Sequence, residues 1–88
     1  MVMEHVVNTR FNRGLQLAQD SGIKIRYEYL HGQGGGICQV NHQLQLFVDL
    51  ALPPLEQLQV LEQALQLVID EQWPVPHLDP LRVWLGNS

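Results

Sequence analysis

Residues 23–50 read IKIRYEYLHGQGGGICQVNHQLQLFVDL, and their pattern decides the fold class. Apolar and polar side chains alternate over 23–30, which is typical of a β-strand with one solvated face. A short strand over 36–41 and a third over 43–50 follow a glycine-rich turn and a tight turn at Asn41-His42-Gln43. Strands joined by short connections usually pair with their neighbours in the sequence. The stretch therefore predicts a three-stranded antiparallel β-meander.

Amphipathic helices are expected before and after these strands in the sequence, over 3–20 and 55–72. Pro53 and Pro54 can supply the cap region and first position of the second helix. Asp79 as N-cap and Pro80 at the first position predict a short terminal helix. The predicted apolar stripes are Val7, Phe11, Leu15 and Ala18 in the first helix, and Leu58, Leu61, Leu65 and Val68 in the second. The sequence predicts a single α+β domain over 1–88, in the order αβββαα, covered by helices.

Gly14 interrupts the first predicted helix. A glycine inside a helix costs about 1 kcal/mol relative to alanine. Gly14 therefore either allows another element to pack closely or marks a weak point in the helix.

Length and composition favour association with a second chain. The chain has 88 residues, of which 45% are hydrophobic and 16% charged, so it is too apolar for disorder but long enough for only a marginal core. A partner subunit would add buried area, and exposed strand edges invite pairing. We expect a homodimer.

Charge and cysteine content exclude several classes of function. The net charge is −4 and the chain has five basic residues, which argues against nucleic acid as a partner. Arg10, Arg13, Lys24 and Arg26 would approach one another only if the first helix packs beside the first strand. No apolar run approaches the ~20 residues of a membrane span. One cysteine and the lack of a signal-peptide pattern predict a cytoplasmic protein.

The glycine run Gly34-Gly35-Gly36 leads into a predicted strand. A phosphate-binding loop would lead into a helix and carry Lys and Ser or Thr, so this interpretation is disfavoured. The favoured interpretation is that the glycines supply positive φ angles or a bulge. Close approach of another backbone or of a small ligand is the alternative.

Cys38, between His31 and His42, is the principal candidate for chemistry. Either histidine could act as base for a nucleophilic thiol, with Glu28 or Asp49 orienting it. Burial in the core is the favoured role of Cys38, because free cysteine is usually buried. The spacing does not match the paired ligands of a structural zinc site. A cross-strand zinc site of these residues, with His5 or His77 as further histidines, is the alternative to having no cofactor.

Two further positions are assigned by strand alternation. Tyr27 and Tyr29 share a face with Ile23 and Ile25, which predicts a core or dimer surface. Asp49 points away from the face of Leu46 and Val48, so we expect it to be solvated or to cap the following helix.

Residues 44–68, LQLFVDLALPPLEQLQVLEQALQLV, resemble the strand-to-helix step before the active-site helix of HExxH zinc metallopeptidases. In that register Gln63, Ala64 and Leu67 stand at the positions of the first histidine, the glutamate and the second histidine. None of them can bind zinc or act as base, so no activity of that kind is expected. The combination of IRYEYL, GGGIC and a glutamine-rich helix also resembles a small bacterial family of uncharacterised function, which implies a small α+β protein.

The sequence thus predicts a non-catalytic protein-interaction module that forms a homodimer. The alternative is a protein that binds a metal ion or small molecule at the hairpin between His31 and His42.

Overall fold

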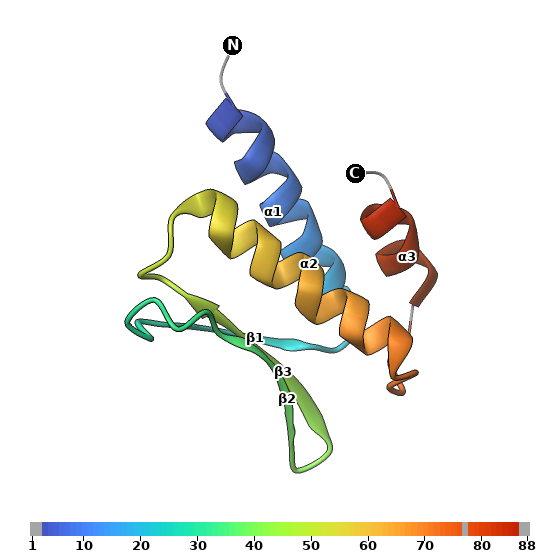
Figure 1. Ribbon diagram of the computed structural model, residues 1–88. Coiled ribbons are helices and arrows are strands. Elements are labelled where there is room, and N and C mark those ends of the chain that lie inside the picture. Colours follow the sequence, from blue (N-terminus) through green and yellow to red (C-terminus); the bar gives the residue numbers. More distant parts are fainter. Residues whose placement is uncertain (1–2, 77, 87–88) are drawn as a thin grey trace.

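The computed structural model describes residues 3–76 and 78–86. Along this part of the chain run α1 (Met3–Asp20), β1 (Lys24–Glu28), β2 (Gly36–Val40), β3 (Gln43–Asp49), α2 (Pro54–Asp70) and α3 (Leu78–Gly86). The sheet forms one layer, α1 and α2 lie on one of its faces, and α3 packs against these two helices (Figure 1). The predicted single α+β domain and the order αβββαα are confirmed.

The predicted antiparallel meander is wrong in the pairing of β1. The strand order is β1-β3-β2, so β3 is central. β1 runs parallel to β3, with Ile25 opposite Leu46, and β2 runs antiparallel to β3, with Ile37 opposite the same Leu46. Since β3 buries its apolar side chains most completely, it takes the centre of the sheet. The glycine-rich loop is long enough to carry the chain past the end of β3 to its other side.

The predicted positions of the hairpin turn, the strands and the helices are confirmed within a few residues. Asn41 and His42 both have positive φ angles, 52° and 69°, as a two-residue turn between β2 and β3 requires. The strands are shorter than predicted, because 24–28, 36–40 and 43–49 replace 23–30, 36–41 and 43–50. The second helix covers 54–70 and has Pro53 as its N-cap. The terminal helix begins at Leu78, one residue before the predicted cap Asp79.

The core lies between the helices and the inner face of the sheet. Its most completely buried apolar side chains come from every layer: Ile23, Leu46, Leu61, Leu65, Val68 and Leu81. Both predicted helix stripes contribute to it, with Phe11 only partly buried. None of the described helices is long and apolar enough to cross a membrane.

Gly14 lies where α1 packs closely against both α3 and α2. A Cβ atom at this position would lie 2.7 Å from Cη2 of Trp84 and 2.9 Å from Cδ2 of Leu61. The Nε1–H of Trp84 donates a hydrogen bond of 3.1 Å to the carbonyl oxygen of Arg10, which fixes the indole against the helix. Of the two roles predicted for Gly14, the structure therefore supports close packing.

Candidate functional site

Asp49 organises the glycine-rich loop from the end of β3. Its carboxylate accepts hydrogen bonds from the backbone N–H groups of Leu30 (3.0 Å), Gly34 (3.1 Å) and Ala51 (2.9 Å). Burial alone would raise the pKa of Asp49, but these three donors and the N–H of Gly32 together lower it below its ordinary value of 3.8. Asp49 is therefore the ionised anchor of the loop.

This role corrects the predicted solvated or capping Asp49. The side chain is 1% exposed, and the N-cap of α2 is Pro53, which makes no side-chain capping hydrogen bond. Strand alternation does place Asp49 away from the core face. It is buried all the same, because the 29–35 loop crosses the end of β3 and covers it.

The glycines of the loop have the conformational role that was favoured from the sequence. Gly32, Gly34, Gly35 and Gly36 all have positive φ angles. At Gly35 a Cβ atom would overlap the carbonyl oxygen of Phe47, so the loop backbone runs directly against β3. The alternative of close approach by another backbone is therefore realised within the chain itself.

The predicted candidate residues His31, Cys38 and His42 are not brought together. His31 lies in the loop before β2, and His42 lies in the turn after it. The five-residue strand between them spans roughly 15 Å, at about 3.3 Å per residue. The described residues hold no group of three or more His, Cys, Asp or Glu side chains that could bind a metal ion. His77 lies outside the described residues.

Cys38 is exposed, so its predicted burial is wrong. The register places Cys38 opposite Gln45, while its neighbour Ile37 points inward opposite Leu46. The thiol thus lies on the sheet face that α1 and α2 leave uncovered (Figure 1). It borders an open hollow of about 380 Å³ formed with Phe47 and the glycine-rich loop.

The edge strand β1 and the residue that follows it present aromatic side chains to solvent. Tyr27 is 53% exposed and Tyr29 is 72% exposed, so these two side chains are not part of the core. Among the described strands β1 pairs only with β3. On the outer sheet face Arg26 forms an ion pair of 3.0 Å with Glu28, and its guanidinium lies 5.7 Å from the Phe47 ring.

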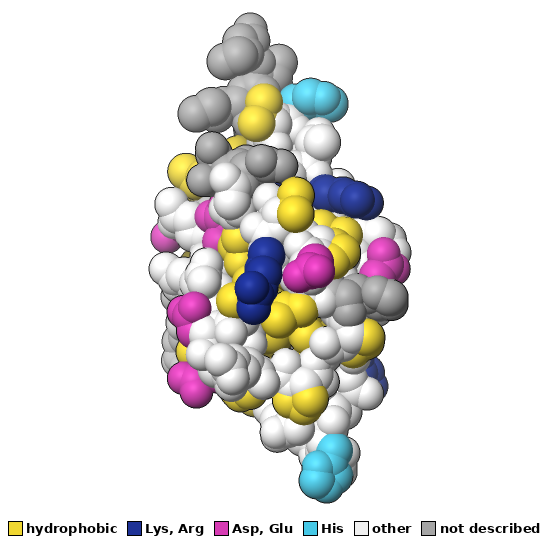
Figure 2. All heavy atoms as spheres, turned by 90° about the vertical axis from the view of Figure 1, so that its right-hand side faces the viewer, with side chains coloured by type: hydrophobic (Ala, Val, Ile, Leu, Met, Phe, Trp, Pro, Cys, Tyr) yellow, Lys and Arg dark blue, Asp and Glu magenta, His cyan; other side chains and the backbone are white. Residues whose placement is uncertain are grey.

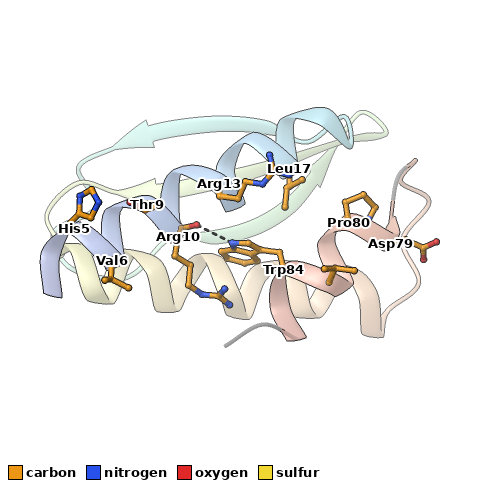
Figure 3. Close-up of a pocket in the computed structure, with 10 residues that line it drawn as sticks. His5, Val6, Thr9, Arg10, Arg13, Leu17, Asp79, Pro80 and Trp84 are labelled. Atoms are coloured by element: carbon orange, nitrogen blue, oxygen red, sulfur yellow. Dashed lines mark hydrogen bonds between the residues drawn. The ribbon is translucent and has the colours of Figure 1, made fainter. Parts of the chain in front are cut away.

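A groove of about 860 Å³ lies between α1 and α3. Its lining includes Val6, Leu17, Val83 and Trp84 as apolar residues. His5 stands at one end and Asp79 at the other, with Arg10 and Trp84 between them (Figure 3). On the molecular face shown in Figure 2, hydrophobic side chains gather at the centre, with basic and acidic side chains lying among them and beside them.

The groove could not be predicted from the sequence, because it depends on how α3 packs against α1. The sequence offered one indication of the groove, namely two valines on the predicted polar sides of their helices. Val6 and Val83 fall outside the apolar stripes of their helices, and both are more than half exposed.

The three positions compared with a metallopeptidase helix lie on different sides of α2. Gln63 and Leu67 are exposed, whereas Ala64 is buried. Comparisons with protein-family models, with curated proteins and with solved structures found no match. The functional argument therefore depends on the surfaces described above.

Proposed function

We propose that the protein is a non-catalytic interaction module that forms a homodimer by pairing β1 with β1 of a second copy. The observation that carries this proposal is the exposure of Tyr27 on the open edge of β1 and of Tyr29 directly after it. Large aromatic side chains are enriched at protein interfaces and contribute much of their binding energy.

The backbone of β1 has N–H and C=O groups that point away from β3 and could pair with a strand of a second copy. The carbonyl oxygen of Glu28 accepts a hydrogen bond of 2.9 Å from the N–H of Leu50, next to β3. Because successive residues of a strand direct their backbone groups to opposite sides, Tyr27 directs its N–H and C=O away from β3. An edge of this kind is a template for another strand.

A two-fold axis at Tyr27 gives a complementary antiparallel register. Arg26 then lies opposite Glu28 of the second copy, and Ile25 lies opposite its Tyr29, each pair occurring twice. Opposite charges and aromatic–β-branched pairs stabilise neighbouring strands by roughly 0.2–1 kcal/mol each. The charges of β1 therefore favour self-pairing in this register.

Sedimentation equilibrium of the purified protein tests the proposal. The wild-type chain is expected at twice its 10.1 kDa mass at micromolar concentration. Tyr27→Lys is expected to give monomer, because two ammonium groups would meet at the axis. Val40→Lys, which changes a half-exposed residue on the opposite edge strand, should leave the dimer intact.

Circular dichroism should show that both variants are folded. A wild-type protein that stays monomeric at all concentrations would contradict the proposal, and so would a Tyr27→Lys dimer as stable as that of Val40→Lys.

The second candidate function is binding of a small molecule or metal ion beside Cys38. It is favoured by one observation, namely that the exposed thiol and the half-buried Phe47 share a hollow with the glycine-rich loop. Native mass spectrometry and metal analysis of untagged protein, compared with Cys38→Ser, would test this function. A stoichiometric ligand that is lost in the variant would support it.

A further inference from the structure

We infer that the free edge of β2 binds an extended segment of a partner protein by strand addition, and that an aromatic side chain of this segment fills the hollow beside Cys38. β2 and β1 lie on opposite edges of the sheet. The inference therefore goes beyond the proposed β1 homodimer and does not depend on it.

The edge of β2 is open to a further strand. Among the described strands β2 pairs only with β3, and its residues Cys38, Gln39 and Val40 are exposed. The hairpin of β2 and β3 projects away from the helices (Figure 1). Proteins commonly protect a free edge with charged side chains or proline, but the sequence GICQV of β2 contains neither. This edge is therefore suited to pairing.

Two residues of β2 direct their backbone groups to this free edge. Val40 and Gln43 face each other across the two-residue turn, so they form a hydrogen-bonded pair, and hydrogen-bonded and non-hydrogen-bonded pairs alternate along the ladder from there. Ile37 and Gln39 therefore stand at non-hydrogen-bonded positions. Their N–H and C=O groups point away from β3, toward the place of an added antiparallel strand.

A gap in the outer face of the sheet lies next to this edge. Gly36 is opposite Phe47, and a Cβ atom at Gly36 would meet no atom of the described residues within 4 Å, its chain neighbours apart. The open hollow of about 380 Å³ lies here, with Gly36, Cys38 and Phe47 among its lining residues. Because Gly36 has no side chain, a residue beyond β2 can reach Phe47 across it.

The gap favours an aromatic residue in the partner segment. The partner residue opposite Gly36 belongs to a non-hydrogen-bonded pair, in which side chains approach most closely. An aromatic side chain at this position is long enough to cross the glycine and pack against Phe47, as aromatic residues do beside glycines of edge strands. Contact between two aromatic rings adds affinity beyond the area that it buries.

The charge of the surroundings favours an uncharged segment. No charged residue is among those that line the hollow or among those of β2. A charged side chain of the partner would lose its hydration there without gaining a counter-ion, so electrostatic complementarity requires a neutral segment. β2 of a second copy is neutral too, but it has no aromatic residue and does not supply the ring that the gap fits.

The experiment compares blocked synthetic peptides of about seven residues, a usual strand length. The parent peptide alternates threonine and valine and has one phenylalanine near its C-terminal end; the second peptide has alanine in place of phenylalanine. The third carries N-methyl groups on the first and third residues before the phenylalanine, whose N–H groups would bond to Ile37 and Gln39. The fourth carries them on the phenylalanine and on the second residue before it, whose N–H groups point away from β2.

Binding to the wild-type protein is measured by fluorescence anisotropy of the labelled peptides. We expect the parent peptide to bind at least about tenfold more tightly than the second and third peptides. The fourth is the matched control for N-methylation and should bind as the parent peptide does.

Substitutions in the protein locate the binding. Gln39→Pro removes one outward N–H without removing a bond to β3, and it should weaken binding of the parent peptide by about tenfold or more. Phe47→Ala should abolish the preference for phenylalanine over alanine. Tyr27→Lys, on the opposite edge strand, is the matched control and should bind as the wild-type protein does. Circular dichroism checks that each variant is folded, and the peptide comparison on the wild-type protein needs none of them.

Binding of none of the peptides, or equal binding of the parent peptide and either the second or the third, would overturn the inference. N-acetyl-phenylalanine amide that binds as tightly as the parent peptide would show that the hollow takes a small molecule instead. Loss of binding in Tyr27→Lys would place the peptide on β1, which also contradicts the inference. Self-association that is lost in Val40→Lys and kept in Tyr27→Lys would mean that a second copy occupies the β2 edge, and both proposals would be wrong. A monomeric wild-type protein that still discriminates between the peptides would contradict the homodimer alone.

Discussion

Replacing Gly14 by alanine sets two effects of opposite sign against each other. Alanine favours the helical backbone by about 1 kcal/mol relative to glycine. The added Cβ, however, would lie 2.7 Å from Cη2 of Trp84 and 2.9 Å from Cδ2 of Leu61, and both side chains are buried. Overpacking of a buried site costs about 1–3 kcal/mol.

Movement of the indole adds a further cost, because it disturbs the hydrogen bond of Trp84 to the Arg10 carbonyl, a bond that contributes about 1 kcal/mol. The sum predicts that Gly14→Ala lowers the free energy of unfolding by about 1–3 kcal/mol. For a domain of this size, each kcal/mol lowers the melting temperature by about 4–8 °C.

Thermal and urea unfolding, followed by circular dichroism, measure this change. Gly86→Ala is the matched control, because it adds the same methyl group to a helical glycine that has no atom of the described residues within 4 Å, and it should be neutral or stabilise the protein by up to about 1 kcal/mol. A double-mutant cycle with Trp84→Leu should reduce the cost of Gly14→Ala. A Gly14→Ala protein more stable than wild type would refute the packing argument.

Three further substitutions probe the glycine-rich loop. The lowered pKa of Asp49 means that its carboxylate stabilises the fold above pH 3.8, and this contribution is lost as the pH falls below that value. Asp49→Asn should therefore lower the free energy of unfolding at neutral pH. In urea unfolding, the difference in this free energy between variant and wild type should shrink below about pH 4. A difference that does not vary with pH would contradict this prediction. Gly35→Ala should destabilise by about 2–4 kcal/mol, through left-handed backbone strain and overlap with the Phe47 carbonyl. Gly32→Ala has a similar φ angle but open space, so thermal unfolding should show only the strain, about 1–2 kcal/mol.

The sequence predicts those parts of the fold that depend on local patterns. Helix periodicity locates α1 and α2, the Pro53-Pro54 pair locates the start of α2, and Asn41-His42 marks the hairpin turn. The partner of β1 is not a local property. An apolar β3 can pair on either edge, and only the path of the loop over Asp49 places β1 beside it.

The errors at Asp49 and Cys38 have related causes. Alternation correctly places Asp49 away from the core, and the observed register places Cys38 on that same face, but neither reveals from the sequence what covers the face. A loop covers Asp49, whereas Cys38 is exposed. General burial statistics for cysteine were therefore a poorer guide than its position next to the inward-facing Ile37.

The central claim, that β1 is the dimer edge, is tested most directly by NMR of the ¹⁵N-labelled wild-type protein over a dilution series. The account predicts concentration-dependent shifts that centre on the backbone amides of residues 24–29 and are small in β2. Shifts that centre on β2 or on the α1/α3 groove, or amide positions that do not change with concentration, would contradict it.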